Sequence, residues 1–262
     1  MISARGLRRA FNAGTASEKV AIAGVDLDVA PAEFVTVIGG NGAGKSTLLN
    51  LLGGAILPDE GRLEIDAADM TRVPEHGRAR LVARVFQDPM IGTAPSLSIE
   101  ENMTLALLRA GGRSLRRART ARRRDLYREC LAKLRLGLED RLQVAAGTLS
   151  GGQRQALALA MATLCPPKLL LLDEHTAALD PRTSALVMEA TLALVAAARL
   201  TTLMVTHNME HALAYGSRVI MMDAGRIVAD IGAQEKMGLG VADLVHRFHL
   251  SDDRMVLART AS

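Results

Sequence analysis

Short apolar runs alternate along this chain with longer stretches whose apolar residues recur at helical spacing. Residues 35–38 form a β-branched run, and residues 169–172 are four consecutive leucines, a pattern typical of a strand buried on both faces of a sheet. Residues 152–164 show helical spacing and are followed by Pro166 and Pro167, which end a helix. The alternation of strands and helices predicts an α/β domain with a parallel sheet.

The rest of the pattern agrees with this layout. Further strands are predicted at residues 62–65, 82–86 and 201–206, and a closing hairpin at 219–222 and 226–230 turns at 223–225. Helices are predicted at residues 45–52, 99–109, 115–136, 184–198 and 209–214. Residues 88–163 have a mostly helical pattern, and we expect them to form an insert in the α/β domain. The sequence shows no internal repeat, so it holds one copy of this unit.

The composition excludes a membrane span. Of the 262 residues 49% are hydrophobic, but no charge-free apolar run reaches the roughly 18 residues that a span requires. The N-terminal stretch carries Arg5, Arg8 and Arg9 and is not followed by an apolar core of signal-peptide length. We therefore expect a cytoplasmic chain whose membrane contact is peripheral. Cys130 and Cys165 lack ligand spacing, and we expect small buried or half-buried thiols.

An arginine-rich segment accounts for the net charge of +4. Residues 109–128 contain nine arginines against a single acid, Asp125. Three interpretations are open: a solvated helical face, contact with anionic lipid headgroups, and contact with nucleic acid. The chain has no Trp and only two Tyr, which argues against recognition of single-stranded nucleic acid by stacking.

A glycine-rich loop follows the β-branched run at 35–38. It fits the phosphate-loop pattern in full, with Thr47 after it, and consists of Gly39, Gly40, Asn41, Gly42, Ala43, Gly44, Lys45 and Ser46. Small residues allow successive backbone N–H groups to surround a β-phosphate, while Lys45 neutralises the β- and γ-oxygens and the Ser46 hydroxyl ligates Mg²⁺. Because a strand is predicted before the loop and a helix after it, the loop predicts nucleotide binding.

Four further motifs follow in order. Leu149-Ser150-Gly151-Gly152-Gln153 precedes a predicted helix. The leucine run then places Asp173 and Glu174 at the C-terminal edge of a strand, where open α/β sheets bind ligands. Leu179-Asp180 comes next, and His207 follows another strand within Val205-Thr206-His207-Asn208.

In this order the motifs resemble those of the nucleotide-binding subunit of an ATP-binding cassette (ABC) transporter. The resemblance runs from about residue 11 to residue 225, and the signature at 149–153 separates this family from other phosphate-loop ATPases. It implies a P-loop NTPase fold with a mixed or parallel central sheet, an N-terminal antiparallel β subdomain and an inserted helical subdomain. We expect a single ABC ATPase domain over 1–262, with a nucleotide-binding core at 1–87 and 164–232, a helical signature subdomain at 88–163 and a helical tail at 233–262.

The resemblance also implies roles for acidic and polar residues. Asp173 would hold Mg²⁺, directly or through water, opposite Ser46, and Glu174 would polarise the attacking water as general base. Gln87, within residues 85–89, matches the loop that touches Mg²⁺ or the water and links the site to the helical insert. His207 matches the switch histidine that contacts the γ-phosphate.

Two sets of residues are expected to bind nucleotide outside the phosphate loop. Phe11 precedes Gly39 by 28 positions, where the family has an aromatic ring that stacks on adenine; the alternative is a core Phe at a strand end. The family's signature binds the γ-phosphate held by a second subunit, and the corresponding residues here are Ser150, Gly151, Gly152 and Gln153. Asp180 would couple the two sites, so the chain is expected to act as a dimer around two ATP molecules.

Two departures from the family pattern occur near the catalytic residues. His175 occupies a position where proline is common, and Ala178 one where glycine is common. Neither departure removes a catalytic group. His175 is close to Glu174 in sequence, but its position does not match the switch.

The segments 173–181 and 86–89 resemble those of cassettes that serve importers of amino acids or similar small solutes. This resemblance implies ATP and Mg²⁺ as cofactors and a second ABC ATPase subunit, either another copy or a paralogue. It also implies permease subunits in the membrane, an extracytoplasmic solute-binding protein as an indirect partner, and a place at the cytoplasmic face of the cell membrane. The alternatives are a soluble ABC ATPase acting on nucleic acid or ribosomes and a cassette for export or lipid trafficking.

Overall fold

The computed structural model describes residues 1–110 and 120–247. Two compact units make up the fold, and each is described by itself. The first comprises Met1–Arg78 and Thr201–Ser262, and the second comprises Ala79–Leu200. The finer division that the sequence predicts, with its boundaries at 87, 163 and 232, stays a prediction.

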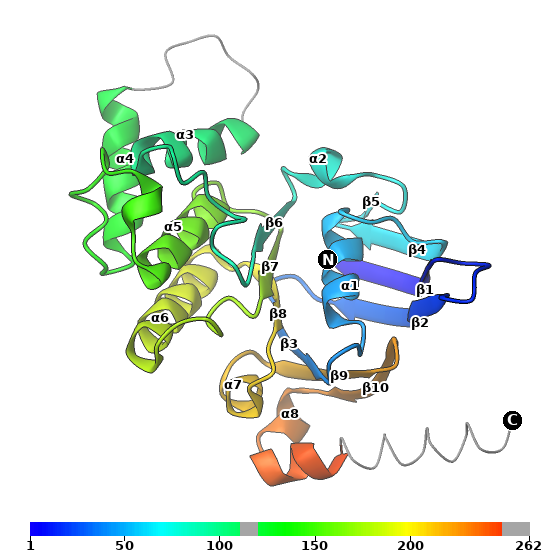
Figure 1. The fold of residues 1–262 in the computed structure, drawn as a ribbon. Coiled ribbons are helices and arrows are strands. Elements are labelled where there is room, and N and C mark those ends of the chain that lie inside the picture. Colours follow the sequence, from blue (N-terminus) through cyan, green and yellow to red (C-terminus); the bar gives the residue numbers. More distant parts are fainter. Residues whose placement is uncertain (111–119, 248–262) are drawn as a thin grey trace, which may run out of the picture. The chain divides into compact units, whose positions relative to one another are not determined.

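An antiparallel sheet at the N-terminus belongs to the first unit (Figure 1). Its strands are β1 (Ile2–Phe11), β2 (Lys19–Val29), β4 (Glu60–Ile65) and β5 (Ala68–Asp69), in the order β2-β1-β4-β5. Along β2, Val25, Leu27 and Val29 are buried while the two aspartates between them are exposed. This alternation is what a strand with one wet face requires.

A second group of strands in the first unit is mostly parallel. The strands are β3 (Phe34–Gly39), β8 (Thr201–Val205), β9 (Arg218–Asp223) and β10 (Arg226–Ile231). β3 pairs in parallel with β8 and with β9, whereas β10 pairs with β9 as an antiparallel hairpin. All four lie close to their predicted positions, because each is a continuous apolar or alternating run.

The described helices of the first unit are short. They are α1 (Lys45–Gly53), α2 (Glu75–Arg78), α7 (Met209–Ala214) and α8 (Ala233–Lys236), and residues 241–247 are also helical. Arg78 is fully buried, and its guanidinium donates to the carbonyls of Leu51 and Leu52 at 2.6 and 2.9 Å. These carbonyls belong to the C-terminal end of α1, where a cation is favourable. Burial lowers the pKa of Arg78 to about 10.

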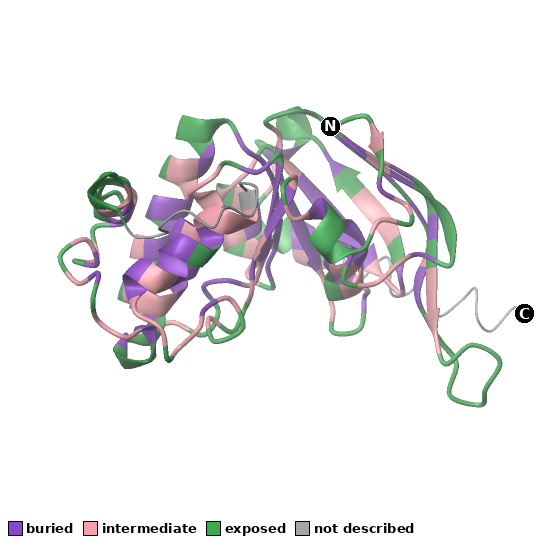
Figure 2. Cartoon of the chain, turned by 90° about the horizontal axis from the view of Figure 1, so that it is seen from above, coloured by how far each residue is buried: buried purple, intermediate pink, exposed green. Residues whose placement is uncertain are grey.

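Over residues 79–110 and 120–200, the second unit holds two parallel strands and four longer helices. The strands β6 (Val82–Val85) and β7 (Leu169–Asp173) pair in register. The helices are α3 (Ile99–Ala110), α4 (Ala121–Ala132), α5 (Gly151–Thr163) and α6 (Pro181–Ala198), with a 3₁₀ turn at Ala146–Thr148. The four leucines of β7 are completely buried, as a wholly apolar strand predicts. Figure 2 shows in purple how buried residues gather on the strands, and most residues of α5 are buried as well.

Two helix boundaries differ from the prediction. The helix expected at 184–198 begins earlier, because Asp180 accepts a hydrogen bond from the Thr183 backbone and Pro181 occupies the first turn. The helix expected at 115–136 ends at Ala132, and Arg135 adopts a left-handed φ of 55° soon afterwards. Residues 115–119 of that prediction, and 248–262 of the predicted tail, lie outside the described residues.

Candidate functional site

The phosphate loop connects β3 to α1 as the sequence predicts. Gly44 precedes α1 with a φ of 101°, and a Cβ added to it would lie 2.5 Å from the Ala21 carbonyl oxygen. A Cβ on Gly39 would lie 2.2 Å from the Met222 carbonyl oxygen. Both positions therefore require glycine for steric reasons. The backbone of Ala43 is fixed as well, because its carbonyl accepts from Gly225 N at 3.0 Å.

The charged and hydroxyl groups of the loop occupy different environments. Lys45 is buried, and its Nζ donates to the carbonyls of Gly39 and Gly40 at 2.7 and 2.9 Å. The ammonium is thereby held inside the curve of the loop. Ser46 is exposed at the start of α1, where a helix N-terminus and its free N–H groups favour an anion.

His207 lies at the same sheet edge as the phosphate loop. β3 and β8 are parallel neighbours, and Thr206 N donates to Val37 O at 3.1 Å. The ends of these strands place Gly39 and His207 next to each other in the order of the sheet. His207 is exposed, and the next residue, Asn208, caps α7.

Phe11 ends β1 and is half-buried rather than part of the core. The Arg9 guanidinium lies 5.3 Å from the centroid of its ring, and Arg9 is held by Asp59 at 2.6 Å. The ring is thus supported by a cation. Stacking of Phe11 on adenine stays a prediction.

Asp173, Glu174 and Gln87 all belong to the second unit. Asp173 ends β7, and Gln87 follows β6, the parallel neighbour of β7. Parallel strands bring the residues at their carboxyl ends to one edge of the sheet. Glu174 has a φ of 45°, an uncommon conformation for a residue other than glycine and one that is often found at functional sites.

Arg84 contacts this group of residues, although no motif in the sequence pointed to it. Its Nη2 lies 2.5 Å from Asp173 Oδ2, and its Cζ lies 4.7 Å from the centroid of the Phe86 ring. The only signal in the sequence was an arginine inside an otherwise apolar strand. Such a residue must find a partner when it is buried.

The signature opens α5 with a capping box. The Ser150 side chain accepts from Gln153 N, and the Gln153 side chain accepts from Ser150 N, each at 3.3 Å. Gly152 packs against α6, because a Cβ added to it would lie 1.9 Å from Thr183 Cγ2. Gly151 is exposed and has no such neighbour.

Asp180 and His175 also lie in the second unit. Asp180 is exposed and caps α6, and its hydrogen bonds with Thr183 lower the pKa of its carboxyl group. His175 is only 2% exposed, and its Nε2 lies 3.1 Å from Thr191 Oγ1 on α6. His175 is thus a buried, hydrogen-bonded residue, whereas His207 is accessible.

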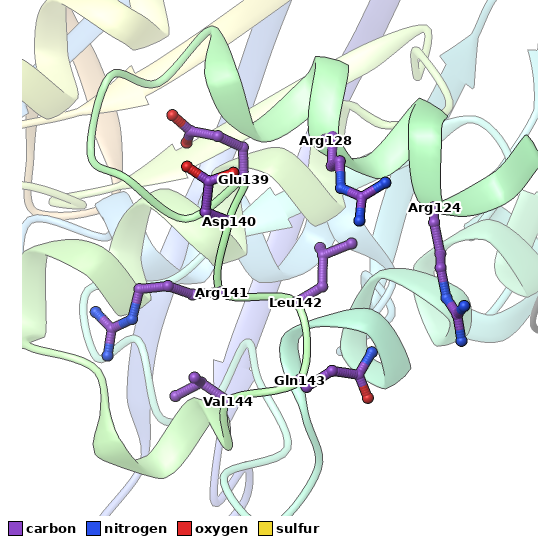
Figure 3. A pocket seen from close by; sticks show the side chains of 8 residues that line it. All are labelled: Arg124, Arg128, Glu139, Asp140, Arg141, Leu142, Gln143 and Val144. Atoms are coloured by element: carbon purple, nitrogen blue, oxygen red, sulfur yellow. The ribbon is translucent and has the colours of Figure 1, made fainter. Parts of the chain in front are cut away.

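The described part of the arginine-rich segment makes internal contacts. Arg124 Nε donates to the buried Glu100 at 2.9 Å, Arg128 pairs with Asp125 at 3.2 Å, and Arg109 donates to Ala162 O at 3.5 Å. Residues 111–119 of the segment are outside the described residues. Figure 3 shows Arg124 and Arg128 beside a hollow of about 320 Å³ that the loop with Glu139 and Asp140 also lines. Acids and arginines therefore share this surface.

A second hollow, of about 210 Å³, lies between α3 and α5. Arg84 and Arg109 line it together with Gly92 and apolar side chains of the two helices, including Leu105. Leu105 is exposed, as are Met90 and Ile91 in the loop before α3. This part of the second unit thus presents apolar groups to its surroundings.

Comparisons with known proteins agree with this geometry. The family model described as ABC transporter matches residues 22–177. The chain is 41% identical over 248 residues to a tyrosine transport ATP-binding protein of Clostridioides difficile (strain R20291), covering 95% of this chain and 98% of the relative. The chain belongs to the ABC transporter family. It is an ABC ATPase subunit, which binds ATP and hydrolyses it to drive transport.

Other relatives serve different transport systems. A lipoprotein-releasing system ATP-binding protein, LolD of Cereibacter sphaeroides, is 38% identical over 232 residues and matches 87% of this chain and 99% of its own length. Among solved structures, the ABC cassette MJ0796 in a dimeric post-hydrolysis state bound to ADP and phosphate superposes with a TM-score of 0.77 at 28% identity, over 89% of this chain and 99% of that chain. ABC cassettes dimerise and work with membrane permease components.

Each unit offers oxygen atoms of the kind that bind a magnesium ion shared with nucleotide. Across residues 1–110 and 120–247, no group of three or more His, Cys, Asp or Glu is arranged to hold a metal alone. Mg²⁺ is typically bound by one or two protein oxygens together with phosphates and water. The Ser46 hydroxyl in the first unit and the Asp173 carboxylate in the second unit are each a donor of that kind. Within the same residues, no helix is long and apolar enough to cross a bilayer.

Proposed function

We propose that this chain powers the uptake of an amino acid or a similar small solute, as a homodimer docked on permease subunits at the cytoplasmic face of the membrane. The observation that supports this proposal is its likeness to a tyrosine transport ATP-binding protein, which extends over 95% of the chain at 41% identity. An extracytoplasmic solute-binding protein would deliver the solute. The ATPase subunit itself would not touch it.

Observed positions support the catalytic roles that we propose. Lys45 would exchange the carbonyls of Gly39 and Gly40 for the β- and γ-phosphate oxygens of ATP, since its Nζ already lies inside the loop. Ser46 and Asp173, with Gln87, would hold Mg²⁺, which neutralises the charge that builds up on the phosphates. Glu174 would accept a proton from the attacking water, and its left-handed backbone turns it out of the strand direction. The exposed His207 would contact the γ-phosphate.

The signature would act on the ATP of a second subunit. Ser150 and Gly151 are exposed at the N-terminus of α5, a helix of 13 residues. Free N–H groups and the helix dipole make such an end favourable for phosphate. With one phosphate loop and one signature per chain, two copies would enclose two ATP molecules, and Asp180 would couple these sites.

The permease would contact the apolar surface of the second unit. Three large apolar side chains are exposed there: Met90, Ile91 and Leu105. Leu105 lines the hollow between α3 and α5, and the other two directly precede Gly92, which also lines it. Exposed apolar groups of this kind mark interaction surfaces. They follow Gln87 in the chain, and through Gln87 movement at this surface would reach the catalytic residues.

Two variants test the catalytic assignment. Glu174→Gln should leave ATP binding intact, abolish turnover and trap a dimer in the presence of ATP. Lys45→Ala should weaken nucleotide binding itself. Turnover by Glu174→Gln at close to the wild-type rate would show that Glu174 is not the general base.

Export or lipoprotein release is the second candidate function, because LolD relatives are 36–38% identical over 86–87% of the chain. Affinity purification of the chain from native membranes separates the candidates. Uptake predicts co-purification of permeases and stimulation of the ATPase by a solute-loaded binding protein. If the ATPase activity of the purified complex were stimulated by a lipid-anchored protein instead, the uptake proposal would be refuted.

A further inference from the structure

Arg84 is the charged residue in a strand that is otherwise apolar. The other residues of β6 are Val82, Ala83 and Val85, and all three are buried. Arg84 is in register with Leu171 of β7, two positions before Asp173. Residues two apart on a strand share a face, and this arrangement directs the arginine toward the carboxylate at the end of β7.

The ion pair between Arg84 and Asp173 is shielded from solvent. Nη2 and Oδ2 lie 2.5 Å apart, and the two side chains are only 14% and 15% exposed. Salt bridges at the surface contribute little, but a charge removed from water to this degree is retained only when it is paired. The pair is therefore a built feature of this sheet edge.

The Arg84 guanidinium also contacts the ring of Phe86. Its Cζ lies 4.7 Å from the centroid of the Phe86 ring, a cation–π distance. The Phe86 carbonyl accepts from Gln155 Nε2 of α5 at 3.0 Å, which fixes the backbone just before Gln87. Arg84 is thus held between an anchored ring and the Asp173 carboxylate.

The same carboxylate is the one assigned to Mg²⁺ above. A guanidinium and a divalent cation are attracted by the same carboxylate and repel each other over a few ångströms, where solvent screens poorly. With Arg84 in place, Mg²⁺ alone gains little at Asp173. ATP changes this balance because its phosphates add the oxygen ligands that Mg²⁺ requires.

We propose that Arg84 is the resident counter-cation of Asp173, and that it keeps binding of a divalent cation at this carboxylate weak until a nucleotide supplies further oxygen ligands. Arg84 is then a positioning residue, since it acts through Asp173. The proposal rests on the assignment of Asp173 to Mg²⁺ in the proposed function.

Binding of Mn²⁺, as a paramagnetic substitute for Mg²⁺, tests this proposal on the nucleotide-free full chain. Electron paramagnetic resonance would measure the free ion for wild type, Arg84→Gln and Arg84→Lys. The matched control is Arg218→Gln, because Arg218 is similarly shielded and pairs with Glu33 and Asp230 in the first unit. A second measurement is the thermal midpoint with Mg²⁺ and with EDTA.

Arg84→Gln should bind Mn²⁺ about tenfold or more tightly than wild type, because the competing charge is gone. Arg84→Lys and Arg218→Gln should bind it as weakly as wild type, and adding Asp173→Asn to Arg84→Gln should remove the gain. Among these proteins, only Arg84→Gln should have a higher thermal midpoint with Mg²⁺ than with EDTA. If Arg84→Gln unfolds in EDTA, refolding with Mg²⁺ is the expected result, and failure to fold with the ion present would count against the proposal.

Equal Mn²⁺ affinity in Arg84→Gln and wild type would overturn the proposal and leave the pair a purely structural one. Equally tight binding by Arg84→Lys and Arg84→Gln would also overturn it, since charge would not be the cause. The proposed function fails separately, if Asp173→Asn alone keeps wild-type turnover with Mg²⁺ and ATP.

Discussion

Replacing Gly152 by alanine tests the contact between the signature helix and α6. An added Cβ would lie 1.9 Å from Thr183 Cγ2 and 3.3 Å from Thr183 Cβ. Carbon atoms in favourable contact are roughly 3.5–4.0 Å apart, so the methyl group of Thr183 must move. Overpacking of this kind costs about 1–3 kcal/mol of unfolding free energy. Ala is better than Gly in a helix interior by up to about 1 kcal/mol. Gly152 lies in the first turn of α5, so this gain offsets at most part of the cost.

Gly151→Ala is the matched control, because it makes the same chemical change one residue away. The Cβ added there would have Leu179 Cδ2 as its nearest neighbour, at 3.7 Å, an ordinary contact. Its stability should equal that of wild type or exceed it by up to about 1 kcal/mol. Thr183→Ser removes the obstructing methyl group, so the double variant Gly152→Ala/Thr183→Ser should recover most of the lost stability.

Urea unfolding of the nucleotide-free chain, followed by far-UV circular dichroism, measures all four variants. Dichroism is the suitable signal because the chain contains no tryptophan. The double-mutant cycle then gives a coupling free energy of about 1–3 kcal/mol between positions 152 and 183. The reasoning is refuted if Gly152→Ala is as stable as Gly151→Ala, or if Thr183→Ser fails to restore it.

Three further predictions follow from individual side chains. His175→Ala should lower the unfolding free energy by about 1–3 kcal/mol in urea melts, since it leaves a cavity and an unpaired Thr191 hydroxyl. His207→Ala should keep the wild-type stability but lose ATP turnover in a phosphate-release assay. If His175→Ala lost turnover and His207→Ala lost stability, the two roles would have to be exchanged. Burial lowers the pKa of His211 in the folded chain. As the pH falls below about 6.5, the unfolded chain therefore binds a proton at this histidine before the folded chain does. The free energy of unfolding should decrease through that range in wild type, and should decrease less in His211→Gln. Burial raises the pKa of the Cys130 and Cys165 thiols. At neutral pH both thiols of the folded chain should therefore react with a disulfide reagent more slowly than glutathione does. A reaction as fast as that of glutathione would contradict this prediction.

The sequence alone predicts much of the fold, because the strands and helices depend on local patterns. The leucine run of β7 has the pattern typical of a doubly buried strand, and the glycines before Lys45 match the phosphate-loop spacing in full. The family resemblance implies an N-terminal antiparallel β subdomain, but it does not give the residue ranges of β1 and β2. The alternation of Val25, Leu27 and Val29 with aspartates was the signal that could have delimited β2.

What only the tertiary structure decided concerns pairs of residues that are distant in sequence. Arg84 and Asp173 are 89 positions apart, and their contact arises from the parallel register of β6 and β7. The fit of Gly152 against Thr183, and the burial of His175 beside Thr191, likewise depend on how α6 packs. A sequence pattern reports which faces are apolar, but the partner of a buried charge is chosen by strand order and register. For that reason the phosphate loop and the carboxylates could be found by their motifs, and the arginine that pairs with one of those carboxylates could not.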